Sequence, residues 1–231
     1  MEFLFDTVNL QEIKDYSKII PISGVTSNPS IIKKEGKINL FSHFRQIREI
    51  IGFDKTLHIQ VVSQDCEQMI REAELILKHV DEKVFIKVPV TKQGLRAIRL
   101  LKNGGVCVTA TAIYSKIQGF LAIKAGADYI APYFNRMQSL DIDAKETIEA
   151  FSKIILRENS ATKILAASFK NSLQICDALL AGAEAATVSP LLLHEALSFA
   201  AVQKAVDNFS NDFSDTFHRK TMEELVESLQ V

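Results

Sequence analysis

The chain has 231 residues, 47% of them hydrophobic, and its 27 basic and 28 acidic side chains give a net charge of −1. This length suits a single barrel-sized domain. The even charge balance excludes the strongly basic surface typical of proteins that bind nucleic acid or an anionic membrane. If the protein recognises a phosphate, it must do so through a local group of cations.

The cysteines and histidines argue against disulfides and a metal site. Cys66, Cys107 and Cys176 are far apart and lack C-x-x-C spacing, which favours free thiols in a reducing compartment. The five histidines lack the spacing of metal ligands. The sequence also has no signal peptide and no apolar run of the ~18 residues that a membrane span needs. We therefore expect a soluble, cytoplasmic protein without a metal or cofactor.

Short apolar runs recur along the chain, each followed by a helix-like segment. They are FLFDT (3–7), ISGVTSN (22–28), TLHIQVV (56–62), VFIKVPV (84–90), VCVTAT (106–111), YIAPYF (129–134), KILAAS (163–168) and AATVSP (185–190). Segments between them, such as 40–51 and 64–79, repeat apolar residues at three- and four-residue spacing. A strand and a helix that alternate eight times predict an α/β fold, a single (β/α)8 TIM barrel over residues 1–198.

Turn and cap residues agree with this alternation. In AGAD (125–128) and AGAE (181–184), a glycine ends a helical segment and directly precedes a strand, where a left-handed residue is favoured. Asp65 and Thr91 stand where helix N-caps are expected. These signals support repeated βα units and give no sign of a duplicated domain.

Residues 199–231 continue beyond the last expected strand as a helical extension with two apolar stripes. The first contains Phe199, Val202, Val206, Phe209 and Phe213, and the second contains Met222, Leu225, Val226 and Leu229 and ends at Val231. A closed barrel does not need these helices. They could fold back on their own barrel, or they could dock on a neighbouring subunit of a homo-oligomer.

Lys87 is the one charged residue in VFIKVPVT (84–91), a run that is apolar on both faces. Such a run is typical of a strand buried in a parallel sheet. Burial disfavours the ammonium form and lowers the pKa of a lysine, so a neutral amine could attack a carbonyl. The alternative is a lysine at a strand end whose stem packs while its amine reaches water.

Polar residues stand where the other apolar runs end, and the chemistry of such barrels lies at these strand ends. They are Asp6, Thr26, Ser27, Asn28, Gln60, Thr109, Thr111, Tyr133, Asn135, Arg136, Ser168 and Lys170. We expect these side chains to meet Lys87 at one mouth of the barrel. Two cations and a hydroxyl near the seventh strand also suggest a phosphate site.

Several of these residues also have a purely structural interpretation. Asp6 could cap the first helix, Thr111 could fill a strand, and Tyr133 could be a packed aromatic with its hydroxyl at the surface. Arg136 could form a surface ion pair. Gln60 is harder to explain in this way, because an amide among apolar neighbours must find hydrogen-bond partners.

The motifs DT (6–7), GVTSNPS (24–30), KVPVT (87–91) and LAASF followed by Lys170 resemble the transaldolase family, in particular its short-chain branch, which includes fructose-6-phosphate aldolase. The resemblance covers nearly the whole chain. It implies that Lys87 forms a Schiff base with a ketose.

The resemblance also implies roles for the residues around Lys87. Asp6 would move protons of substrate hydroxyls, and Asn28, with Thr26 beside it, would orient the bound intermediate. A phosphate would be held by Arg136, Ser168 and Lys170. The subunits would assemble into a pentamer or a decamer, with the C-terminal helix exchanged between neighbours.

Two positions distinguish the branches of this family. Typical transaldolases carry glutamate and phenylalanine where this chain has Gln60 and Tyr133, and the aldolase branch carries glutamine and tyrosine. Because glutamine cannot shuttle a proton, the phenol of Tyr133 is the candidate acid/base, with Gln60 and Thr111 positioning a water. Lys170 stands where transaldolases usually have arginine, so a point charge replaces a bidentate fork.

The resemblance implies a metal-free Schiff-base (class I) aldolase that cleaves fructose 6-phosphate reversibly to dihydroxyacetone and glyceraldehyde 3-phosphate. The alternative within the family is a transaldolase of the pentose phosphate pathway, which transfers the dihydroxyacetone unit between sugar phosphates. The alternative outside it is a barrel that binds sugar phosphates without catalysis.

Overall fold

The computed structural model describes residues 1–227, and it confirms the predicted barrel. Its strands are β1 (Glu2–Asp6), β2 (Gly24–Thr26), β3 (Thr56–Gln60), β4 (Phe85–Pro89), β5 (Val108–Ile113), β6 (Tyr129–Pro132), β7 (Lys163–Ala166) and β8 (Ala185–Val188). They pair in chain order, all parallel, and β8 pairs with β1 to close the barrel. Each of the eight apolar runs forms one strand.

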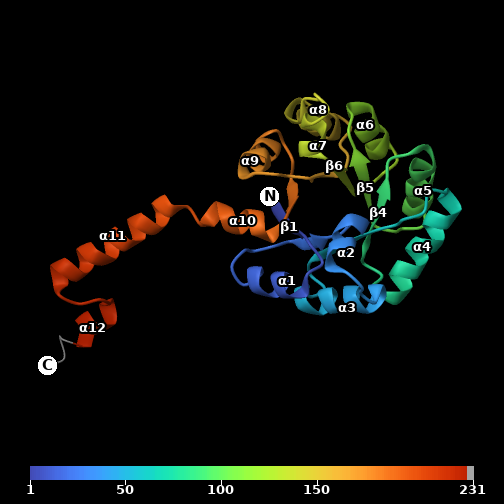
Figure 1. The fold of residues 1–231 in the computed structure, drawn as a ribbon. Helices are drawn as coiled ribbons and strands as arrows, with labels where there is room; N and C mark the ends of the chain where they lie inside the picture. Colours follow the sequence, from blue (N-terminus) through green and yellow to red (C-terminus); the bar gives the residue numbers. More distant parts are fainter. Residues whose placement is uncertain (228–231) are drawn as a thin grey trace. The chain divides into compact units, whose positions relative to one another are not determined.

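Helices follow the strands and surround them, as Figure 1 shows. They are α1 (Leu10–Tyr16), α2 (Pro29–Glu35), α3 (Leu40–Ile51), α4 (Cys66–His79), α5 (Lys92–Asn103), α6 (Lys116–Lys124), α7 (Phe134–Gln138), α8 (Ala144–Arg157) and α9 (Ser172–Leu180). Because each helix runs back antiparallel to the strand before it, the carboxyl ends of all strands open at the same end of the barrel.

The helices begin and end at the residues that the sequence indicates. The side chains of Asp65 and Thr91 accept hydrogen bonds from the backbone N–H groups of Gln68 and Gly94, at 3.1 and 3.0 Å. Gly126 and Gly182, each just after a helix, have positive φ angles of 86° and 108°. The predicted caps and turns are therefore confirmed.

Asp6 was considered above as a possible cap of the first helix, α1. Its N-cap is Asn9, whose Oδ1 accepts from Glu12 N at 2.9 Å. Asp6 is thus not a helix cap, and its carboxylate is directed to other partners.

The N-terminal half of the barrel interior is filled by a packed layer of side chains. Leu4, Tyr129, Leu165 and Ala185 are buried there, with Phe85 packed against them. The phenol of Tyr129 donates to Glu2 Oε2 at 2.9 Å, so the polar tip of this aromatic is satisfied. The barrel interior is thus filled with side chains at this level.

The chain divides into two compact units, residues 1–192 and the residues that follow. The second unit contains the end of α10 (Pro190–Leu197), then α11 (Ala200–Phe217) and α12 (Met222–Glu227). The predicted stripe residues Phe199, Val202, Val206 and Phe209 are exposed. Leu229 and Val231 of the second stripe lie outside the described residues. Within the described part of the chain, no helix has the length and apolar character to cross a bilayer.

The start of α5 lies so close to the end of β4 that only glycine fits at position 94. A Cβ added to Gly94 would stand 1.9 Å from the backbone oxygen of Pro89, which is two residues beyond Lys87. The Gly94→Ala variant must therefore push β4 and α5 apart. We expect it to lose about 2 kcal/mol of stability and roughly 5 °C in Tm.

Gly104→Ala is the matched control, at the C-cap of the same helix. An added Cβ there makes only ordinary contacts, the nearest at 3.4 Å to Leu101 O. Thermal unfolding followed by circular dichroism compares the two variants. Equal Tm values for both would contradict this view of the β4–α5 junction.

Candidate active site

A cavity of about 460 Å³ opens at the carboxyl ends of β1, β7 and β8. It is lined by Asp6, Thr7, Val8, Asn9, Glu12, Ile31, Lys34, Glu35, Ser168, Phe169, Lys170, Thr187, Val188 and Ser189. Three of the residues predicted from the strand ends, Asp6, Ser168 and Lys170, therefore line one cavity.

Lys87 lies on β4 inside the barrel and is only 3% exposed. Its amine does not reach bulk water, so the alternative of an exposed strand-end lysine is wrong. The Nζ atom donates a hydrogen bond to the backbone oxygen of Ser27 at 2.8 Å. Burial lowers the pKa of Lys87, while the negative charge of Asp6 acts in the opposite direction. The amine is thus nearer to its neutral, nucleophilic form than a lysine in water.

Asp6 ends β1 and is held by a pair of buried hydroxyls. Thr26 Oγ1 donates to Asp6 Oδ1 at 2.7 Å, and Thr187 Oγ1 lies 2.5 Å from Thr26 Oγ1. Because the single proton of Thr26 goes to Asp6, Thr187 must be the donor to Thr26. Thr26 is fully buried and therefore positions the carboxylate; a direct contact of Thr26 with substrate stays a prediction.

Opposing effects act on the ionisation of Asp6. Burial raises the pKa of this carboxyl, and the positive charge of Lys87 and the hydrogen bond from Thr26 act to lower it. Burial thus pushes the acid and the lysine toward their neutral forms, while each favours the charged form of the other. Such a pair is suited to exchange of protons with a bound substrate.

The layer directly beneath Lys87 is polar but uncharged. Thr109 pairs with Lys87 in the sheet register, and its hydroxyl lies 2.8 Å from Nδ1 of His58. His58 is fully buried and stacks on Phe85 with ring centroids 4.8 Å apart. Burial holds the pKa of His58 well below its ordinary value, so the imidazole stays neutral. It therefore adds no positive charge beneath the lysine.

Tyr133 follows β6, and Thr111 on the neighbouring strand contacts its phenol. Thr111 Oγ1 donates to the phenol oxygen at 3.1 Å. Between Ala110 and Ile113 the β5–β6 register shifts, and Ala112 has a positive φ of 57°. This bulge changes the direction of the strand at the residue that binds the phenol. Thr111 thus has a specific partner, which the strand-filling interpretation did not foresee.

The phenol of Tyr133 is protonated at neutral pH. Burial raises its pKa, which outweighs the hydrogen bond from Thr111 and the positive charge of Arg136. The guanidinium of Arg136 lies over the Tyr133 ring, 4.6 Å from the centroid. Tyr133 can consequently serve first as a proton donor, and its ring is fixed from one side by a cation.

The three predicted phosphate ligands are not equivalent. Ser168 and Lys170 line the cavity beside Asp6, and Ser168 has a positive φ of 66°, which is uncommon outside glycine. Arg136 lies on α7, outside the lining of this cavity, and donates to Tyr114 OH at 3.1 Å. Among the described residues, no carboxylate lies within ion-pair distance of Arg136, so the surface ion pair is not formed.

Asn28 and Gln60 hold different positions at the mouth. Asn28 caps α2 through its Oδ1, which accepts from Ile31 N at 3.0 Å, and this leaves its Nδ2 as a donor. The Oε1 atom of Gln60 is buried and has no hydrogen-bond partner among residues 1–227. An unsatisfied buried acceptor costs about 1–3 kcal/mol, so its retention suggests that a ligand group completes it. Gln60 also lines a second hollow of about 600 Å³ between the ends of β3 and β4.

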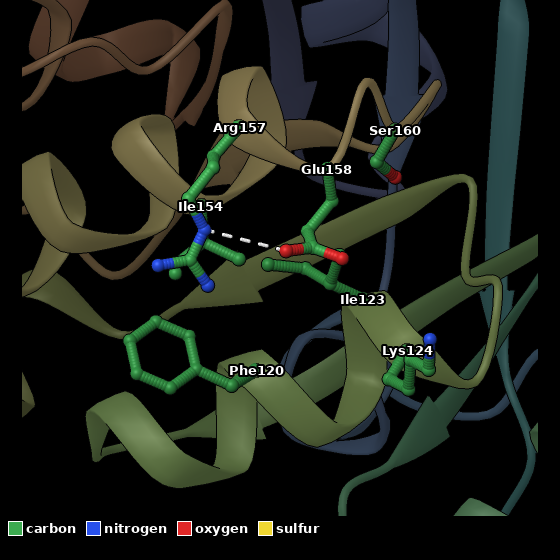
Figure 2. A pocket seen from close by; sticks show the side chains of 7 residues that line it. All are labelled: Phe120, Ile123, Lys124, Ile154, Arg157, Glu158 and Ser160. Atoms are coloured by element: carbon green, nitrogen blue, oxygen red, sulfur yellow. Dashed lines mark hydrogen bonds and ion pairs between the residues drawn. The ribbon is translucent and has the colours of Figure 1, made fainter.

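Another hollow lies between α6 and α8, shown in Figure 2. Phe120, Ile123 and Ile154 line it, beside an ion pair between Arg157 and Glu158 at 3.3 Å. It is found toward the C-terminal ends of these helices, and therefore at the end of the barrel away from the strand mouths. It lacks the buried, mutually interacting titratable groups that surround Lys87.

Sequence reasoning missed three contributors to the site. Thr187 could have been found as a lone hydroxyl inside the apolar run AATV, by the argument applied to Gln60. The Ser27 carbonyl is a backbone group, and no side-chain pattern indicates it. Lys34 stands in an exposed helical turn, which resembles any solvated surface. In the described part of the chain, no three His, Cys, Asp or Glu residues gather as a metal site would require.

Comparisons with known proteins show which family this chain belongs to. The family described as Transaldolase/Fructose-6-phosphate aldolase matches residues 3–230. A relative named "Probable fructose-6-phosphate aldolase", from Streptococcus pneumoniae, is 52% identical over 92% of this chain and 96% of its own length.

A solved structure, inosine 5′-monophosphate dehydrogenase from Legionella pneumophila, matches with a TM-score of 0.57 at 15% identity, over 83% of this chain and 58% of its own. That likeness concerns the barrel fold alone. The family match over nearly the whole chain, together with the relative at 52% identity, identifies the protein as a member of the transaldolase/fructose-6-phosphate aldolase family.

Proposed function

We propose that the protein is a Schiff-base aldolase that cleaves fructose 6-phosphate to dihydroxyacetone and glyceraldehyde 3-phosphate, and that runs the reverse addition. The observation that carries this proposal is the burial of Lys87, which lowers the pKa of an amine that interacts with Asp6 at the strand ends. The name of the Streptococcus pneumoniae relative supports this substrate. Three free cysteines agree with a cytoplasmic location.

In the proposed reaction, the neutral Nζ of Lys87 attacks C2 of the ketose, and loss of one water gives an iminium. The C3–C4 bond then breaks: its electron pair moves into the iminium to form an enamine, and the C4 hydroxyl loses its proton as the aldehyde forms. Protonation of the enamine at C3 and addition of one water then release dihydroxyacetone and restore the amine. Atoms and charges balance without a metal or cofactor.

The proton transfers are assigned to Asp6 and Tyr133. Asp6, in its ionised form, takes the proton of the C4 hydroxyl, helped by the nearby positive iminium. Tyr133 is a protonated phenol and supplies protons to the leaving water and to the enamine. Thr111 donates to the phenol oxygen and so stabilises the phenolate that this transfer leaves.

The remaining residues bind and orient. Gln60, whose Oε1 lacks a partner, accepts a hydrogen bond from the hydrolytic water, with Thr111 on the other side. Asn28 donates from Nδ2 to a hydroxyl of the intermediate. Ser168, Lys170 and Arg136 bind the phosphate, the first two from within the cavity. Holding the ketose in this frame converts the bond cleavage into an intramolecular step.

We expect Lys87→Met to abolish aldolase turnover and covalent trapping together. Wild-type protein incubated with dihydroxyacetone and borohydride should gain one adduct per chain on the peptide that contains Lys87, as read by mass spectrometry. Lys83→Met removes an exposed lysine just before the same strand and should leave both properties intact.

Product analysis on fructose 6-phosphate completes this test. Free dihydroxyacetone is the expected product. Transfer to erythrose 4-phosphate that far exceeds release would make the protein a transaldolase, and an unlabelled Lys87 would refute the Schiff base.

We expect Asp6→Asn to have opposite effects on two readouts. The charge of Asp6 raises the pKa of Lys87, so its removal lowers that pKa, and the amine becomes neutral at lower pH. The pH midpoint of Schiff-base formation with dihydroxyacetone should therefore move down. Turnover of fructose 6-phosphate should nevertheless fall about 10²-fold, because the proton acceptor is lost.

Stopped-flow absorbance or quenched trapping across pH measures the first readout. Asp15→Asn, an exposed acid on α1, is the control and should change neither quantity. A midpoint that stays in place or rises in Asp6→Asn would contradict the proposed coupling of the two groups.

We further propose a homo-oligomer in which the extension docks on a neighbouring subunit. The apolar side chains Phe199, Val202, Val206 and Phe209 on and beside α11 are 58%, 53%, 50% and 70% exposed, and burying them would stabilise an interface. A ring of five, or two stacked rings, is the expected assembly.

Light scattering tests this assembly. Truncation after residue 198, or the paired change Val202→Lys and Phe209→Lys, should lower the molar mass toward that of a monomer. Asn208→Lys, an exposed polar position on the same helix, should leave the mass unchanged. An unaltered mass in the truncated protein would refute the role given to the extension.

A further inference from the structure

The acidic side chains on the β1–α1 side of the cavity already have partners. Glu12 Oε2 accepts from Thr7 Oγ1 at 2.9 Å. Both carboxylate oxygens of Glu35 lie near Asn9 Nδ2, at 3.2 and 3.3 Å. Because Glu35 ends α2, this contact fixes the end of that helix to the loop after β1. The rim of the cavity is therefore a defined structure rather than a loose loop.

Lys34 stands directly before Glu35 and lines the same cavity as Asp6, Ser168 and Lys170. Among the described residues, neither Lys34 nor Lys170 has a carboxylate within ion-pair distance. The positive charge of Lys34 nonetheless reaches the cavity floor, where it acts to lower the pKa of Asp6 against the larger effect of burial. Two unpaired ammonium groups thus border one cavity, Lys34 from α2 and Lys170 from the loop after β7.

We propose that Lys34 is a further phosphate ligand of this site, and that it raises the preference of the enzyme for phosphorylated over unphosphorylated substrates. This inference rests on the proposed aldolase function. Lys170 is a point charge and cannot bind a phosphate as a bidentate fork, so a second ammonium from α2 complements it. A phosphate dianion bound between Lys34, Lys170 and the Ser168 hydroxyl would have its charge matched by two cations.

Comparison with Lys33 distinguishes phosphate binding by Lys34 from a stabilising effect of a lysine on helix α2. Both lysines lie in the last turn of α2, where a positive charge interacts favourably with the helix dipole. Only Lys34 lines the cavity with Asp6; Lys33 lines an apolar groove between α2, α3 and α4. An effect that acts through the helix should therefore appear when either lysine is replaced. An effect that acts through phosphate binding should appear only when Lys34 is replaced.

The test compares wild type, Lys34→Gln and Lys33→Gln in the direction of aldol addition. Dihydroxyacetone is the donor, and glyceraldehyde 3-phosphate or glyceraldehyde is the acceptor. We expect Lys34→Gln to lower kcat/KM for the phosphorylated aldehyde about fivefold, as befits an exposed charge pair, and to leave glyceraldehyde within about twofold. The loss should shrink between about 0.01 M and 1 M salt, as the charges become screened. Lys33→Gln should leave kcat/KM unchanged for both substrates.

A ³¹P NMR titration with inorganic phosphate gives a readout that does not depend on turnover. Weaker phosphate binding by Lys34→Gln than by wild type and Lys33→Gln supports the inference. Equal affinities in all three proteins, or an equal loss in both variants, would overturn it. Trapping at Lys87 decides the aldolase function separately, so the failure of one proposal is distinguishable from failure of the other.

Discussion

The site depends on how an amine can be kept inside a closed parallel barrel. Lys87 has apolar neighbours along β4, and its amine donates a hydrogen bond to the backbone oxygen of Ser27. The barrel interior excludes the water that would otherwise stabilise an ammonium ion, and the pKa of the amine falls. The fold thus moves the amine toward its neutral form, which is the form that the proposed reaction needs.

The other buried groups are arranged so that they do not cancel this effect. His58, in the layer below, remains neutral, and the hydroxyls of Thr109 and Thr26 supply polarity without charge. The charge of Asp6 favours the ammonium form of Lys87, while burial raises the pKa of Asp6 itself. The balance between these two groups sets which of them holds the proton when the ketose arrives. Hydroxyl contacts from Thr26 and Thr187 fix the acid in place, so the balance is built into the geometry.

Much of this arrangement could be predicted from the sequence because a parallel barrel has simple rules. Each of the eight apolar runs forms one strand, and Asp6 and Ser168, which stand at the ends of two of these runs, line the same cavity. Lys87 was recognisable because a lysine within a strand that is apolar on both faces is expected to be buried with that strand. The N-caps Asp65 and Thr91 could be identified because each side chain bonds a backbone N–H group only three residues further along the chain.

The parts that escaped prediction depend on contacts between distant strands or on the backbone itself. The hydrogen bond from Thr26 to Asp6 was not predicted, because only the pairing of β1 with β2 brings these two residues together. The contact of the Arg136 guanidinium with the Tyr133 ring was also not predicted, because it depends on where α7 places the arginine. The bulge at Ala112 also has no sequence signature, because alanine does not favour a positive φ.

The most direct test of the account is a titration of Lys87 itself. Protein labelled with ¹³C at the lysine Cε, with Lys87→Met used to assign the signal, reports the pKa of this one amine by NMR. We expect a midpoint well below the ordinary lysine value, together with a signal that disappears when dihydroxyacetone is added and trapped. A Lys87 that titrates like the surface lysines would contradict the proposed role of this amine, since only its neutral form can attack the ketose.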